Sequence, residues 1–403
     1  TIRGRGKGMR LISNILSRRS VVCGVGAAAA TCLLPLRGAL TAPPVTIGVL
    51  LPTSGGLNDH VAQIRLGVTA AVAELNEKDG VLGRPLRLAF RDSEGTLRNL
   101  ANRCAELVRD EKAQAVIGPF VAAGRKTAAR ALASSRVPLL TASNNEGGFC
   151  TLGAFTLAPT PYQDSFPLLQ YLDGGRGRSY FLVGSGTSWQ RSMFRRTVLR
   201  VLYHHGGKVL GEALTRIGET NFEPVARWIA ATEADVVLLC VPRRNGSEFV
   251  RQAHAIGLLD RIDLGWLGFN EMHAQDLGAD LAKKVVTASS FVASDTANGV
   301  PALASQLDSH AGDSMPITYY AFTHYTAIMA LASAWRSAGE ASGEAALRAL
   351  PDTVFEGATG RIGFDGQSRQ AKLPMVIGRG TGEGALEVIE RLGIVDPGPG
   401  CNT

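Results

Sequence analysis

Short apolar runs alternate with stretches of helical periodicity along most of the chain. Val45–Leu51 is a continuous apolar run, which is typical of a strand buried on both faces. From Ile64 to Leu75 apolar residues recur at helical spacing, and Asp79-Gly80 ends this predicted helix. The succession of strand and helix repeats as far as Leu140. It therefore predicts parallel βαβ units with right-handed crossovers.

A second set of strands and helices follows the first. Its predicted strands are Tyr180–Val183, Val209–Leu214, Val236–Val241, Leu264–Leu267 and Val285–Ala288. No linker rich in Pro, Gly or Ser separates the two halves, so we expect direct backbone connections. The pattern predicts an α/β protein with two doubly wound parallel-sheet lobes.

The charge of the chain is concentrated at its start. The 403 residues carry a net charge of +7. Residues 1–44 contain seven Lys or Arg and no acid, so the rest holds 42 − 7 = 35 cations against 35 anions. A neutral body has no general attraction to phosphate backbones, and no nucleic-acid partner is expected.

The basic start has the layout of an export signal. Arg18-Arg19 precede the apolar stretch Val21–Leu36, as a positive segment precedes the apolar segment of a secretory signal. The arginine pair, flanked by serines, resembles a twin-arginine signal, and a general secretory signal is the alternative. We expect residues 1–44 to comprise upstream residues and this signal, and the mature protein to be periplasmic.

Residues for catalysis are sparse. The sequence has no HExxH, GxSxG or GxxxxGK[ST] motif, and no cysteine and histidine spacing for zinc. We therefore expect no cofactor, no metal and no enzyme. Glu271 and His273, after the strand Leu264–Leu267, keep an exported enzyme open as an alternative. The glycines from Gly378 to Gly384 are interpreted as a flexible turn.

The cysteines allow two interpretations. In an oxidising compartment Cys104 and Cys150 could form a disulfide. Alternatively Cys104, on a helical apolar stripe, and Cys240, within a strand, are buried free thiols that pack as small apolar side chains.

Small polar residues gather where the predicted strands end. Ligands of open α/β sheets bind at the carboxyl ends of the strands. Two lobes with such loops could enclose a small polar molecule. The loops are Pro52–Gly56, Phe120–Gly124, Thr141–Asn145, Ser185–Trp189, Pro242–Asn245, Asn270-Glu271 and Ser289–Phe291.

Two segments carry a family resemblance. Gly80–Leu86 reads G-V-L-G-R-P-L, and Gly357–Gly366 matches a closing hairpin. With Val45–Leu50 and Val116–Pro119, they make residues 45–394 resemble the solute-binding proteins of ABC transporters, in the class for branched-chain amino acids, urea and short-chain amides. The resemblance implies a type I periplasmic-binding fold with a three-segment hinge. It divides the chain into lobe one (45–162 and 292–351), lobe two (163–291 and 352–394) and a flexible tail (395–403).

The resemblance also implies ligand contacts. By position they are Ser54, Phe120, Ala122, Ser143, Asn144, Thr187, Trp189, Glu271 and Phe291. The loop Val121-Ala122-Ala123 lacks the hydroxyls with which amino-acid binders hold a carboxylate, and Ala142 and Thr187 stand where urea and amide binders tend to have tyrosines. The resemblance therefore predicts the fold and the transport role of this chain better than it predicts the ligand.

The expected function follows from this resemblance. It is capture of a small polar solute, of amino-acid, urea or short-amide type, in a cleft between the lobes, and delivery to the membrane subunits of an ABC permease. A ligand-sensing regulatory protein of the same fold is the alternative.

Overall fold

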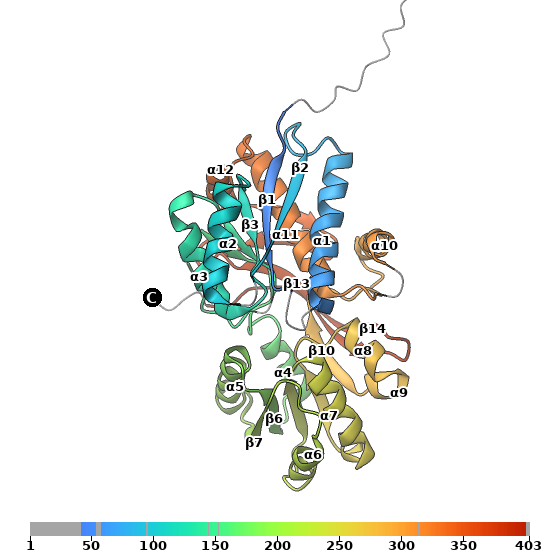
Figure 1. Cartoon of the computed structure of the whole chain (residues 1–403). Helices are drawn as coiled ribbons and strands as arrows, with labels where there is room; N and C mark the ends of the chain where they lie inside the picture. The colour runs from blue at the N-terminus through green and yellow to red at the C-terminus, as the bar shows by residue number, and fades with distance from the viewer. Residues whose placement is uncertain are drawn as a thin grey trace, which may run out of the picture. The chain divides into compact units, whose positions relative to one another are not determined.

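The computed structural model describes residues 42–53, 58–93, 96–143, 145–151, 153–312 and 315–399 (Figure 1). The predicted export signal, Ser54 and Asn144 lie outside these residues. Within the described ranges, no helix has the length and apolar character needed to cross a membrane.

Five parallel strands form the sheet of the first lobe, in the order β2-β1-β3-β4-β5. The first of them has the bounds that its apolar run predicts, whereas the short fifth strand was not predicted. The strands are β1 (Val45–Leu51), β2 (Leu86–Asp92), β3 (Ala115–Ile117), β4 (Leu139–Thr141) and β5 (Ala154–Thr156).

Helices cover both faces of this sheet, which is why β1 is apolar throughout. Ile47 and Val49 pack with α1 and α11, which lie side by side (Figure 1). Leu50 faces α2 and α3 on the other side. The helices of this lobe are α1 (Asn58–Glu77), α2 (Leu97–Arg109), α3 (Arg125–Leu132), α10 (Val300–His310), α11 (Tyr319–Ala338) and α12 (Gly343–Ala349).

The second sheet has nine strands. The order is β11-β12-β13-β10-β9-β8-β6-β7, with β14 paired to β13. The part from β10 to β7 is parallel, as predicted, and the later strands join antiparallel at β10. The strands are β6 (Ser179–Ser185), β7 (Lys208–Thr215), β8 (Val236–Cys240), β9 (Asp263–Trp266), β10 (Val285–Ser289), β11 (Val354–Gly357), β12 (Gly360–Phe364), β13 (Ala371–Gly380) and β14 (Leu386–Val395).

The helices of the second lobe also pack on both faces of its sheet. α4 and α5 cover one face, and α6, α7 and α8 the other. α7 lies so close to β9 that a Cβ on Gly246 would overlap the Trp266 ring, so glycine is required there. The helices are α4 (Ser165–Asp173), α5 (Ser188–Arg200), α6 (Glu223–Ala230), α7 (Arg243–Ala255), α8 (Glu271–Leu277) and α9 (Ala279–Ala282).

The predicted pair of α/β lobes is confirmed, and the chain crosses between them at three places. The crossings follow β5, β10 and α12. The assignment of 352–394 to lobe two remains a prediction, because Ile362 and Leu373 of the last strands pack in the hydrophobic cluster of the first lobe. The first residue of the predicted tail, Val395, ends β14, and the carbonyl of Pro397 accepts a hydrogen bond from Thr160 at 2.9 Å.

One sequence interpretation needs correction, and of the two interpretations of the cysteines the buried free thiols are confirmed. Gly378 and Gly380 belong to β13 and are not part of a flexible turn, since close packing of Gly380 on Ala282 holds this strand end in place. Cys104 is a buried free thiol, as is Cys240, whereas Cys150 is disulfide-bonded. A Cys104–Cys150 bridge is therefore excluded, and burial raises the pKa of the Cys104 thiol.

Candidate functional site

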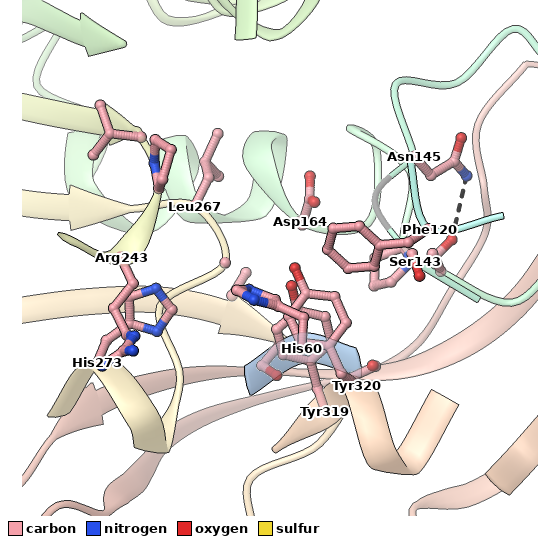
Figure 2. A pocket seen from close by; sticks show the side chains of 18 of the residues that line it. His60, Phe120, Ser143, Asn145, Asp164, Arg243, Leu267, His273, Tyr319 and Tyr320 are labelled. Carbon is pink, nitrogen blue, oxygen red and sulfur yellow. Dashed lines mark hydrogen bonds between the residues drawn. The ribbon is translucent and has the colours of Figure 1, made fainter. Parts of the chain in front are cut away.

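A cavity of about 160 Å³ lies where the two lobes face each other (Figure 2). Both lobes supply its walls, and the polar and aromatic side chains mix there. It is lined by His60, Phe120, Ser143, Asn145, Ala158, Pro159, Asp164, Gln190, Val241, Pro242, Arg243, Leu267, Gly268, His273, Ala288, Ser289, Ser290, Tyr319 and Tyr320.

The carboxyl ends of six strands open into this cavity. In the first lobe Phe120 follows β3, Ser143 follows β4 and Ala158 follows β5. In the second lobe the residues after β8 and β9, and Ser289 at the end of β10, complete the wall. This is the edge at which open α/β sheets bind ligands.

The remaining polar lining residues come from the starts of helices. His60, Gln190, Arg243 and His273 lie in the first turns of α1, α5, α7 and α8. Asp164 is the N-cap residue of α4, and Tyr319 and Tyr320 begin α11. Helix N-termini carry a partial positive charge and free amides, so their convergence favours an anionic group in the cavity.

Burial suppresses most of the charge on the lining side chains. Desolvation lowers the pKa of His60 to about 4 and the pKa of His273 well below its usual range, so both are neutral at pH 7. Desolvation raises the pKa of Asp164 to about 8, against hydrogen bonds that favour its carboxylate. Among the lining residues, Arg243 is thus the side chain that is charged at neutral pH.

An aromatic cluster forms one wall of the cavity. The His60 ring lies 5.3 Å from the Phe120 ring and 5.0 Å from the Tyr320 ring, measured between centroids. Phe120 and Tyr320 are 5.7 Å apart in a tilted arrangement. Such a wall contacts the apolar part of a small ligand.

A buried polar network fixes the amide of Asn145. The guanidinium of Arg125, only 2% exposed, donates to Asn145 Oδ1 at 3.0 Å and pairs with Glu146. The Asn145 amide nitrogen donates to Gln370 Oε1 at 2.7 Å. Because Arg125 bonds the oxygen of the Asn145 amide and Gln370 bonds its nitrogen, the amide has a fixed orientation at the cavity wall.

Two of the residues predicted to contact ligand, Phe120 and Ser143, line the cavity. Ser143 Oγ lies 3.5 Å from Nε2 of the buried His324. Ser54 and Asn144 lie outside the described residues, and the side chain of Trp189 is likewise not described.

The other four predicted contact residues do not line this cavity. Thr187 caps α5, and the Ala122 carbonyl accepts a hydrogen bond from Arg125. Glu271 Oε1 accepts a hydrogen bond from the backbone of Ala293 at 2.9 Å, in the segment that crosses between the lobes. Phe291 stacks on Phe322 with ring centroids 4.9 Å apart.

The sequence analysis missed the helix-start residues. His60, Asp164, Tyr319 and Tyr320 were not singled out, although Asp164 and Tyr319 stand where helices begin. A systematic reading of first helical turns after strand ends would have found His60 and Asp164, because α1 follows β1 and α4 follows β5. It would not have found Tyr319 and Tyr320, because α11 follows α10 and not a strand. Among the described residues, no group of three His, Cys, Asp or Glu is placed to hold a metal ion.

Comparison with known proteins agrees with the two-lobed fold. A family profile described as periplasmic binding protein matches residues 44–385. The Leu/Ile/Val-binding protein BraC3 of Rhizobium johnstonii is 22% identical over 315 residues, which are 76% of this chain and 83% of that protein.

Two solved structures share the fold. An amino acid ABC transporter substrate-binding protein from Pseudomonas fluorescens Pf-5 superposes with a TM-score of 0.79 at 17% identity, over 90% of this chain and 99% of that chain. The ABC transporter solute binding protein of Rhodopseudomonas palustris BisB5, in complex with 3,4-dihydroxybenzoic acid, gives 0.77 at 18% identity, over 88% and 99%.

Proposed function

The chain belongs to the periplasmic binding protein family, and from this premise we propose that it captures a small carboxylate-bearing solute of amino-acid type and delivers it to the membrane permease of an ABC transporter. One observation carries the proposal: strand ends and helix N-termini of both lobes surround a single cavity. Export to the periplasm, by the twin-arginine or the general route, is part of the proposal.

The two-lobed wall suggests the mechanism. A solute that contacts Phe120 and Ser143 in one lobe and Arg243 and Ser289 in the other binds the closed arrangement more tightly than an open one. It therefore shifts the population toward the closed form, which the permease recognises. A solute that contacted one lobe alone would leave the population unchanged.

The electrostatics of the wall favour one ligand class. Helix N-termini and the Arg243 guanidinium attract a carboxylate, which neutral urea and short amides lack. Asp164, the acidic residue among those that line the cavity, can accept hydrogen bonds from an ammonium group once it has lost its proton. An α-amino acid carries both groups, so it is the first candidate.

A monocyclic aromatic acid is the second candidate, favoured by the aromatic wall and the size of the cavity. An apolar cavity of ~150 Å³ holds a benzene molecule, and this one measures about 160 Å³. The similar structure from R. palustris is a complex with 3,4-dihydroxybenzoic acid. With this ligand Asp164 would keep its proton and donate to a ring hydroxyl.

The test uses protein freed of ligand by unfolding and refolding. Thermal shift and calorimetry are measured with leucine, alanine, urea, acetamide and 3,4-dihydroxybenzoate. Carboxylates are expected to raise the melting temperature most, and a ligand at 100 times its Kd adds about 2.7 kcal/mol of stability. Stabilisation by none of the five would contradict the proposal.

The regulatory alternative needs a separate measurement. Binding of the ligand-loaded protein is measured to its permease in nanodiscs and, in parallel, to a chemoreceptor ectodomain. Ligand-dependent binding to the permease supports transport, whereas binding to the receptor alone supports ligand sensing.

A further inference from the structure

Exposed apolar side chains are concentrated on one part of the second lobe. Of the twelve large apolar side chains that are exposed in the described residues, six lie within 19 positions of the chain. They lie at the end of α5, in the π-helical turn Val201–His205 that follows it, in β7 and just beyond β7. These six are Leu199, Leu202, Tyr203, Leu210, Leu214 and Ile217. Together with the exposed cations described below, we call these residues the α5–β7 surface; Figure 1 shows the position of α5 and β7 in the second lobe. A concentration of this kind on a water-exposed lobe marks an interaction site.

The α5–β7 surface is hollowed. A groove of about 310 Å³ runs between α5 and β7 and is lined by Arg191, Phe194, Arg195, Val198, Leu199, Glu212 and Leu214. β7 is the last strand of its sheet, so one side of its backbone has unpaired amides and carbonyls. The groove can thus receive an apolar side chain beside a strand edge that still offers hydrogen bonds.

The same surface is basic. Residues 188–216 contain six Lys or Arg and one Glu, whereas the rest of residues 45–403 has 35 − 6 = 29 cations against 35 − 1 = 34 anions. Arg191, Arg195, Lys208 and Arg216 are exposed, and none of the four forms an ion pair with a described residue. Arg200, in contrast, makes a cation–π contact, since its guanidinium carbon lies 4.8 Å from the centre of the Phe166 ring.

We propose that the α5–β7 surface docks an acidic segment of the permease, on its extracytoplasmic side, that inserts an apolar side chain into the groove. This inference rests on the proposed function. Surface arginines that form no ion pair within the described part of the chain surround an apolar groove, and they complement a partner of negative charge. A second copy is disfavoured because a twofold contact would bring two copies of this positively charged surface together. A concave groove also suits a protruding side chain better than the flat surface of a membrane.

The experiment compares two matched double variants of the full protein. Arg195→Glu with Leu199→Ser alters the α5–β7 surface, and Arg98→Glu with Leu97→Ser alters an exposed Arg and Leu pair on α2 of the other lobe. Each protein is titrated against the permease in nanodiscs of neutral phosphatidylcholine. Ligand affinity, circular dichroism and molar mass by light scattering are measured in parallel.

We expect the α5–β7 variant to bind the permease at least tenfold more weakly with unchanged ligand affinity, and the α2 variant to match the wild type. Equal binding by both variants overturns the docking surface and leaves the proposed function intact. Absence of permease binding by the wild type overturns the delivery role itself. Wild-type binding to phosphatidylglycerol vesicles, or a dimer that the variant abolishes, would instead assign the surface to lipid or to self-association.

Discussion

The guanidinium of Arg243 is ion-paired with the carboxylate of Asp59, which ties the first turn of α7 to the first turn of α1. The pair connects the two lobes beside the cavity that Arg243 lines. A carboxylate ligand would compete with Asp59 for the same guanidinium. The ion pair therefore links ligand binding to the contact between the lobes.

Replacing Arg243 should weaken the binding of a carboxylate ligand. A hydrogen bond to a charged group contributes about 1.5–3 kcal/mol, so Arg243→Gln is expected to weaken binding of an amino acid by roughly 10- to 100-fold. Calorimetry measures this, with Arg244→Gln as the control because Arg244 is exposed and does not line the cavity. Equal affinities of the two variants would exclude contact between Arg243 and the ligand.

Removing Asp59 should have the opposite effect. A partly exposed ion pair is worth about 1 kcal/mol or less, so Asp59→Asn is expected to tighten carboxylate binding by up to about fivefold, because Arg243 loses its competitor. The effect should fade above ~0.5 M salt, where screening is strong. A weaker affinity in the variant would show that the ion pair stabilises the bound form instead.

Asp164 should make amino-acid binding depend on pH. Burial raises its pKa from 3.8 to about 8, and an ammonium group binds only the carboxylate form. Affinity for an amino acid should rise from pH 6 to pH 8 and then level off, with close to one proton released per ligand at pH 7. Calorimetry in phosphate and Tris buffers measures this release, and Asp164→Asn should abolish it. An aromatic acid should release no proton.

The same pKa predicts a trend in stability. The folded protein holds the Asp164 proton up to about pH 8, while the ordinary pKa of the group is 3.8. The unfolded chain therefore loses this proton first, and the contribution of Asp164 to stability falls as the pH rises between these values. Urea titrations of Asp164→Asn should lack this part of the slope.

Substitution of Phe120 should affect ligand binding, whereas substitution of Phe291 should affect the stability of the fold. Phe120 lines the cavity, whereas Phe291 is 2% exposed and stacks on Phe322. Phe291→Ala should lower the free energy of unfolding by about 3 kcal/mol. Phe120→Ala should instead weaken ligand binding. Unfolding in urea and calorimetry distinguish the two, and a purely binding effect at Phe291 would show that its ring reaches the ligand.

Arg125 should matter for folding although it is charged. Breaking a fully buried ion pair costs about 3–5 kcal/mol. Glu146 is 29% exposed and Asn145 keeps its bond to Gln370, so Arg125→Met is expected to cost less, about 2 kcal/mol. Arg130→Met, on the exposed side of the same helix, should change stability by less than about 0.5 kcal/mol. Urea unfolding checks both, and equal stabilities would contradict a structural role for Arg125.

Part of the site follows from local sequence patterns. The strand β1 and the loops after β3 and β4 were predicted because a run such as Val45–Leu51 requires a two-sided core, and strand ends in such a sheet converge. Phe120 and Ser143 lie at the cavity for that reason. β14, in contrast, was missed, because its burial is irregular and its pairing with β13 contains register shifts.

The order of strands and helices, the two α/β lobes and the edge that holds the cavity were determined by the sequence, since buried strands and amphipathic helices are encoded by neighbouring residues. The tertiary structure alone decided which side chains face the cavity. The Glu271 carboxylate accepts a hydrogen bond from the backbone of Ala293, and the Phe291 ring stacks on Phe322 of α11, so neither side chain lines the cavity. His60, Asp164 and Tyr320 meet from three helices far apart in the chain. Contacts between residues this far apart in the chain depend on long-range packing, which no local sequence pattern specifies.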